Sequence, residues 1–89
     1  MTFAELRYNN RGFLKTKMKQ YSDAIEDYTK TIELKPKYAT AYNNRGWANL
    51  NLKNYNDAIN DFQMAIIFNP NKPIYKNNLK QAQEKMLKK

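Results

Sequence analysis

The chain has 89 residues, with 16 Lys or Arg against eight Asp or Glu and with neither cysteine nor histidine. This length predicts one small domain, and the missing cysteine and histidine exclude disulfides, thiolate metal sites and a histidine general base. The net charge of +8 attracts anionic partners such as an acidic peptide, RNA or an anionic membrane surface, although lysines can equally serve only to keep a small domain soluble.

No apolar run approaches the ~18–20 residues of a membrane span, and the first residues, Met1-Thr2-Phe3-Ala4, do not begin a signal peptide. We therefore expect an intracellular protein of the cytoplasm. A segment cut from a longer protein would give the same pattern.

Apolar residues at helical spacing predict two helices in the first half of the chain, over residues 5–18 and 21–34. The turn Lys19-Gln20 joins them. The apolar face of the second helix ends with Leu34, and Pro36 stops this helix because proline cannot continue the hydrogen-bond ladder.

The same pattern returns in the second half, with helices expected over residues 39–52 and 55–68. Leu52 closes the apolar face of the first of these two. A fifth helix, with Pro73 at its start, is expected from Ile74 to about Leu87. Its surface is mostly Lys, Gln and Asn, which suits the last helix of an open stack.

A repeat of 34 residues underlies this pattern. The pentapeptide Tyr8-Asn9-Asn10-Arg11-Gly12 recurs at residues 42–46, and 13 identities fall within one 34-residue window. A period of this size indicates stacked helix-turn-helix units. Glycine inside a helix costs about 0.5–1 kcal/mol relative to alanine. Its repetition at Gly12 and Gly46 therefore predicts two close helix crossings.

Several residue types around these crossings have expected roles. Ala24 and Ala58 should keep the second helix of each pair close, and Arg11 and Arg45 could each bind a phosphate or carboxylate of a ligand. We favour a structural role for the arginines, with the stem packed between helices and the guanidinium on a nearby carboxylate. Large rings should fill the space between helices: Tyr8, Tyr21, Tyr28, Tyr42, Tyr55 and Phe62.

Small residues at positions 8 and 20 of each unit, aromatics at 4, 17 and 24 and proline at 32 make the sequence resemble the tetratricopeptide repeat family. The resemblance implies an all-α fold of five helices, an α-solenoid of antiparallel helix hairpins in a right-handed superhelix. Residues 5–38 and 39–72 would be two hairpins and residues 73–89 a capping helix, in one domain. Two repeats are fewer than the three usually needed, which favours a piece of a longer array or an oligomer.

The chain departs from the family at two places in each unit. The family often has glycine in the turn where this chain has Lys19-Gln20 and Lys53-Asn54. It often has an aromatic residue in the first helix where this chain has Lys15 and Asn49. These differences suggest a weaker packing layer within the same fold.

In this family the first helices line a concave groove that binds an extended or helical peptide. Carried over by position, the groove would comprise Asn9, Phe13, Lys17, Thr40, Asn43, Asn44, Trp47, Asn51, Asn77, Asn78 and Gln81, with Leu6, Asn10, Thr16, Leu50, Ile74 and Lys85 beside them. The asparagines form two columns, 9/43/77 and 10/44/78, which could hold a peptide backbone or could pair with each other or with water. Trp47, the only Trp, is expected off the core as an apolar anchor.

Chaperone-binding members of the family grip a C-terminal carboxylate with two Lys, two Asn and one Arg. Of the five matching positions only Asn44 agrees, whereas Asn9, Phe13, Ile74 and Asn78 depart. We therefore do not expect that particular ligand.

The sequence predicts a non-catalytic protein-protein interaction module or scaffold that needs no cofactor and no metal. It has no His, Cys or glycine-rich phosphate loop, and its acidic pairs, such as Asp23 with Asp27 and Asp57 with Asp61, are expected to face solvent. The partner would be a protein or peptide, attracted more strongly if acidic because the first helices and the tail are basic.

Two alternatives remain. The basic first helices and the basic tail could bind RNA or another polyanion. Against this, Lys15, Lys17 and Lys30 match Asn49, Asn51 and Met64, whereas repeated phosphate contacts should recur in register. The protein could also assemble with itself through the ends of the stack, at Phe3, Leu6 and Met86-Leu87.

Overall fold

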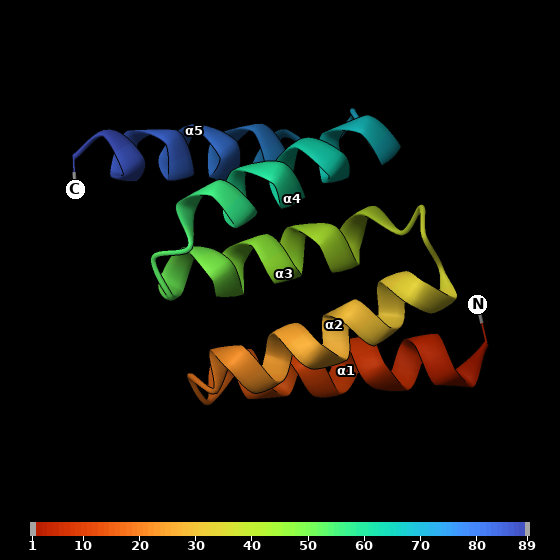
Figure 1. Ribbon diagram of the computed structural model, residues 1–89. Helices are drawn as coiled ribbons and strands as arrows, with labels where there is room; N and C mark the ends of the chain where they lie inside the picture. Colours follow the sequence, from red (N-terminus) through yellow and green to blue (C-terminus); the bar gives the residue numbers. More distant parts are fainter. Residues whose placement is uncertain (1, 89) are drawn as a thin grey trace.

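The computed structural model describes residues 2–88 and consists of helices stacked side by side and the short turns that join them (Figure 1). The helices are α1 (Phe3–Lys17), α2 (Tyr21–Leu34), α3 (Ala39–Asn51), α4 (Tyr55–Phe68) and α5 (Pro73–Leu87). The all-α fold of five helices is thus confirmed, and each helix lies within two residues of its expected bounds. No helix within residues 2–88 combines the length and the apolar character needed to cross a membrane.

The helices form two antiparallel hairpins followed by a single helix. α1 packs on α2, α3 packs on α4, and α2 also packs on α3, so that the hairpins stack; α5 packs on α4 and touches α3. The stack measures 40 × 28 × 17 Å. Figure 1 shows α1 and α5 at opposite ends of it, which leaves one helix face uncovered at each end.

The turn inside each hairpin has an unusual backbone conformation. Lys19 and Lys53 have φ angles of 62° and 66°, in the left-handed region that costs an L-residue roughly 1–2 kcal/mol. The amide of the next residue closes each turn: Gln20 donates to the carbonyl of Lys15 at 2.8 Å, and Asn54 donates to that of Asn49 at 2.9 Å. This conformation explains why the family often has glycine here.

The buried core follows the 34-residue repeat. One cluster joins α2 to α3, and the equivalent cluster joins α4 to α5. α5 therefore packs on the second hairpin as α3 packs on the first. Ala24, which we expected at the crossing within a hairpin, lies in the first cluster with Tyr28 and Ala48. Their equivalents in the second cluster are Ala58, Phe62 and Ala82.

The two glycines lie against aromatic rings. A Cβ atom on Gly12 would lie 2.7 Å from Cε1 of Tyr28, and one on Gly46 would lie 2.8 Å from Cε1 of Phe62. Both rings are fully buried and have little freedom to move away. The expected steric reason for glycine is present, and the ring supplies it.

Some apolar residues lie outside the core, against expectation. Leu34 and Leu52, which we assigned to the buried faces of α2 and α3, are 49% and 38% exposed. Each is the last apolar residue of its face, at or just past the helix end, where no following helix turn covers it.

Candidate functional site

A paired arginine and aspartate link the two helices of each hairpin. Arg11 donates two hydrogen bonds to the Asp27 carboxylate, of 2.9 Å from Nε and 2.7 Å from Nη2. Arg45 binds Asp61 in the same way, at 3.0 and 2.8 Å. The structural role expected for the arginines is thus found. Asp27 and Asp61 are only 3% and 5% exposed, so our expectation that they face solvent was wrong.

A third donor completes each pair. The Lys15 ammonium lies 3.1 Å from Asp27, and the Asn49 amide donates to Asp61 at 3.2 Å. These are the positions where the family often has an aromatic residue, and here each side chain contacts the buried carboxylate of its hairpin.

The two carboxylates titrate differently. The hydrogen bond from Arg11 is the main cause that lowers the pKa of Asp27. Burial raises the pKa of Asp61, and the hydrogen bonds from Arg45 and Asn49 oppose that rise. These acids therefore hold the helices together and are not available to a ligand.

A cavity of about 270 Å³ lies between α1, α3 and α5, the helices that we expected to line a concave groove. Trp47 and Phe13 are 39% and 48% exposed, so Trp47 lies off the core as expected. The cavity brings together five of the predicted groove residues, two that we expected beside them (Thr16 and Ile74), and Tyr28, which was not expected there. It is lined by Phe13, Thr16, Tyr28, Asn43, Asn44, Trp47, Ile74 and Asn78.

The asparagines of the groove are paired across helices. Asn44 donates to Asn9 at 3.4 Å, and Asn78 donates to Asn43 at 2.9 Å. These pairs join positions 35 residues apart instead of forming the columns 9/43/77 and 10/44/78. Asn43 keeps both amide hydrogens, and Asn44 keeps its oxygen and one hydrogen. These groups border the cavity and can bind a ligand.

The floor of the cavity is polar at one place that sequence reasoning missed. The hydroxyls of Thr16 and Tyr28 lie 2.9 Å apart, and burial raises the pKa of the Tyr28 phenol. One repeat later the same two positions hold Leu50 and Phe62. This joint change from a polar to an apolar pair was the signal in the sequence that could have located the contact.

A second cavity, of about 160 Å³, continues the groove between α3 and α5. Asn51, Gln81 and Lys85 were expected in the groove, and Lys53 and Tyr55 were missed. Leu50 is only 5% exposed and packs with Phe62, so it belongs to the core and only borders the groove. The full lining is Trp47, Leu50, Asn51, Lys53, Tyr55, Gln81 and Lys85.

The remaining predicted groove residues are Asn9, Lys17, Thr40 and Asn77, which line neither of these cavities; Asn9 is buried. The Lys17 ammonium lies 4.9 Å from the centre of the Phe13 ring, in a cation–π contact at the edge of the groove. Asn77 is exposed and Thr40 is partly buried.

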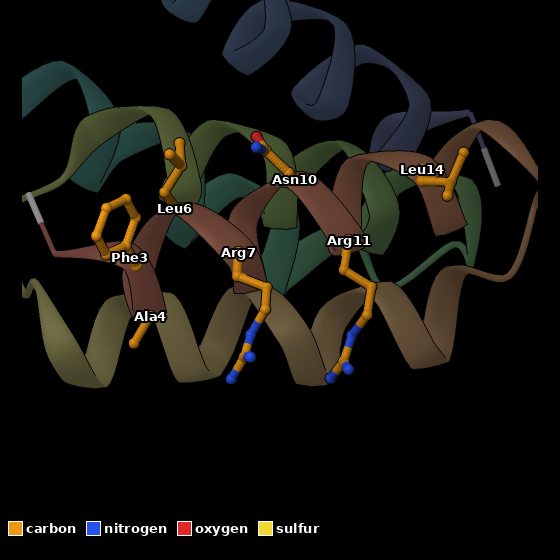
Figure 2. Close-up of a pocket in the computed structure, with 7 residues that line it drawn as sticks. All are labelled: Phe3, Ala4, Leu6, Arg7, Asn10, Arg11 and Leu14. Carbon is orange, nitrogen blue, oxygen red and sulfur yellow. The ribbon is translucent and has the colours of Figure 1, made fainter.

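A third cavity, of about 660 Å³, lies on the outer face of α1 at the end of the stack (Figure 2). Leu6 and Asn10 lie here and not in the concave cavity, so their assignment to the groove was wrong. Figure 2 shows Arg7 and Arg11 extending in parallel along one side of this face. The lining is Phe3, Ala4, Leu6, Arg7, Asn10, Arg11 and Leu14.

Residues 2–88 contain no group of three or more His, Cys, Asp or Glu side chains that could hold a metal ion. The polar groups of the concave cavities are amides, hydroxyls and ammonium groups. Such groups can bind peptide amides and carboxylates.

Three solved tetratricopeptide domains illustrate what the chain is similar to. An Arabidopsis OM64 TPR domain is 27% identical with a TM-score of 0.92, over 96% of this chain and 70% of that one. The second TPR domain of human RPAP3, in complex with the HSP70 peptide SGPTIEEVD, is 28% identical with a TM-score of 0.86, over 89% of this chain and 66% of that one. The second TPR of Spaghetti (RPAP3), bound to the HSP90 peptide SRMEEVD, is 26% identical with a TM-score of 0.91, over 97% and 80%.

No curated protein sequence is significantly similar to this chain. The chain spans about two thirds of the length of several solved domains that it matches, for example 66% of the human RPAP3 domain. The sequence profile of the tetratricopeptide repeat matches residues 6–38 and 39–72. These two matches cover most of the chain and coincide with the two hairpins of the structure, and the chain therefore belongs to the tetratricopeptide repeat family.

Proposed function

We propose that this protein is a non-catalytic interaction module that binds a peptide or partner helix in the concave groove between α1, α3 and α5. The observation that carries the proposal is the 270 Å³ cavity, in which apolar side chains border amides with unused hydrogen-bonding groups. An apolar side chain of the ligand would enter between Phe13, Trp47 and Ile74. Asn43 and Asn44 would hold its backbone, because a carboxamide both donates and accepts.

The peptides bound by two similar domains support a peptide ligand. The human RPAP3 domain was solved with SGPTIEEVD and the Spaghetti domain with SRMEEVD, and both peptides are acidic. An acidic ligand also suits a chain of net charge +8. Since only Asn44 matches the carboxylate-gripping residues of chaperone-binding members, the ligand of this chain should differ from those two peptides.

Parallel selections can test the class of ligand. The protein would be used to select from a library of random peptides on phage and, separately, from a library of random single-stranded RNA. We expect peptides to be enriched at physiological salt, and RNA to be retained only at low salt, because screening weakens contacts made by charge alone. Enrichment of a defined RNA sequence, with no enriched peptide, would favour nucleic-acid binding and sink the proposal.

A variant pair can then locate the binding surface. Trp47→Ala should weaken an enriched peptide at least about tenfold, because anchor residues in a groove often contribute 2 kcal/mol or more. The control is Gln63→Ala, at an exposed position of α4, which should bind as the parent does. Circular dichroism should show unchanged helicity in both variants. Equal affinity of Trp47→Ala and the parent would show that the peptide binds elsewhere.

The outer face of α1 supports a second candidate, self-association. The equivalent face of α3 is covered by α2, with Ala41 and Ala48 fully buried. On α1 the apolar side chains of Phe3, Leu6 and Leu14 are exposed instead. Sedimentation equilibrium of the parent and of Leu6→Lys would test this. We expect a concentration-dependent dimer that the substitution abolishes, whereas a monomeric parent at all concentrations would exclude it.

A further inference from the structure

The concave groove contains two neighbouring compartments that share one side chain. Trp47 lines both the 270 Å³ cavity and the 160 Å³ cavity. Along α3 the lining proceeds from Asn43 past Trp47 to Asn51, and along α5 from Ile74 to Lys85. A ligand that lies along these two helices therefore passes from one cavity to the other over the indole ring.

The two compartments differ in charge. The larger one is lined by rings, amides and hydroxyls and contains no charged side chain. The smaller one has two cationic side chains, Lys53 from the turn after α3 and Lys85 from α5, and no acidic residue in its lining. Among residues 2–88, the salt bridges involve Arg11, Lys15 and Arg45 only, so neither lysine of the smaller cavity forms one. The acidic side chain of Asp57 lines a separate neighbouring cavity together with Lys53.

We infer that the smaller cavity is a carboxylate subsite formed by Lys53 and Lys85, and that the ligand is a peptide with an apolar residue in the larger cavity and an acidic group in the smaller one. This inference rests on the proposed function. It assigns a charge to a particular place in the groove, at positions other than those of the carboxylate grip that this chain lacks.

The spacing of the two cavities defines the peptide further. The residues of α5 that line the larger cavity are Ile74 and Asn78, and those that line the smaller one are Gln81 and Lys85. Their midpoints are seven residues apart, or about 10 Å at the helical rise of 1.5 Å per residue. An extended peptide covers this distance in about three residues. The acidic group should therefore lie about three residues from the apolar anchor.

A double variant with a matched control tests the subsite. Lys53→Gln/Lys85→Gln removes both charges. Lys19→Gln/Lys80→Gln removes two charges outside the subsite, and Lys19 is the turn residue equivalent to Lys53, with the same left-handed backbone. Both variants have the same net charge, and therefore the same long-range attraction. Equal thermal midpoints would exclude a folding defect as the cause of any difference.

The probe is the peptide most enriched from the phage library by the parent protein, synthesised with its acidic residue and with Gln in its place. Fluorescence of the single Trp, which lies between the cavities, reports binding. We expect Lys53→Gln/Lys85→Gln to weaken binding of the acidic peptide about 3- to 30-fold, as two exposed charge pairs allow. The control variant should bind the acidic peptide with an affinity within twofold of that of the parent. The Gln peptide should bind all three proteins alike.

The results separate the inference from the proposed function. If enriched peptides bind and depend on Trp47 but carry no acidic residue near the expected spacing, or lose equal affinity in both double variants, the carboxylate subsite is wrong and the groove stands. If Trp47→Ala leaves peptide binding unchanged, the groove itself is wrong, and the subsite falls with it.

Discussion

A single methyl group decides how closely the helices of a hairpin approach. Glycine normally weakens a helix, and alanine at position 46 would improve helix propensity by about 0.5–1 kcal/mol. In this structure the added Cβ would lie 2.8 Å from the ring of Phe62 and 3.1 Å from Cβ of Asp61. Overpacking of a filled core costs about 1–3 kcal/mol, so the steric term exceeds the gain in propensity.

We therefore expect Gly46→Ala to lower the free energy of unfolding, by up to about 2 kcal/mol net. Urea denaturation followed by circular dichroism measures this directly. In a Phe62→Leu background the ring is absent, and the same substitution should cost less. Additive effects of the two substitutions would show that the ring does not impose the glycine.

The sequence could predict the glycines but not the asparagine pairs. Gly12 and Gly46 each lie inside a predicted helix, where glycine is unfavourable, so the sequence alone indicates that close packing requires them. Asn43 recurs at 34 residues, yet it pairs with Asn78, 35 residues away. The rotation of one hairpin on the next sets that offset, and this rotation depends on the packing of many side chains together. Residue identity alone therefore placed the amides on the correct helices and gave them the wrong partners.

At the scale of the helix pair, the arginine paired with a buried aspartate stabilises the two hairpins unequally. The Arg45 side chain is 22% exposed and that of Arg11 is 52% exposed. Without Arg45, Asp61 would keep only the neutral Asn49 amide as a donor, whereas Asp27 without Arg11 would keep the Lys15 ammonium. An unpaired buried charge is costly, so the second hairpin depends more on its arginine.

We expect Arg45→Met to cost about 3–5 kcal/mol at neutral pH, and Arg11→Met to cost less. Chemical denaturation of both variants tests this order. The second variant is the matched control, since the same groups are removed one repeat earlier. A larger loss in Arg11→Met would contradict the assigned roles of Asn49 and Lys15.

The free energy of unfolding that Arg45→Met loses relative to the parent should depend on pH in one direction. Burial already raises the pKa of Asp61, and loss of the guanidinium should raise that pKa further. When the pKa of a carboxyl is higher in the folded state than in the unfolded state, the protein loses stability as the pH rises through the folded-state pKa. The deficit of Arg45→Met relative to the parent should therefore shrink between pH 7 and pH 5. A constant deficit over this range would show that Asp61 stays ionised.

At the scale of the whole molecule, α5 covers the second hairpin as α3 covers the first. Tyr75 and Ala82 of α5 are 4% and 0% exposed, and Phe62 and Ala65 of α4 are fully buried. A chain that ends at Lys72 would expose this apolar face of α4. In a solenoid each unit is stabilised mainly by its neighbours. Removal of α5 should therefore destabilise the second hairpin and, through it, the first.

We expect the chain of residues 1–72 to have a lower and broader thermal transition and to aggregate more readily. Circular dichroism and light scattering measure both effects. The control keeps α5 and replaces its exposed Lys76, Lys80 and Gln83 with alanine, which should leave the transition near that of the parent. An unchanged transition in the shortened chain would show that α5 is not part of the core.

The stack as a whole was accessible from the sequence, and the groove only in part. A period of 34 residues with proline at each hairpin end was enough to place all five helices. The cavities depended on which side chains remain exposed once the helices pack. Leu50, for example, is buried in the core, whereas Lys53 from the following turn lines the groove.

Several differences between the repeats are matched within one hairpin. Thr16 is matched to Tyr28, and Leu50 to Phe62. Lys15 and Asn49 each serve the aspartate of their own hairpin. An engineer who grafts one complete hairpin into a longer array would carry these matched partners along. A mosaic that combines α1 with α4 would replace the Tyr28 hydroxyl by a phenyl ring and leave Thr16 only the Gly12 carbonyl of its own helix, so the complete hairpin is the better unit to exchange.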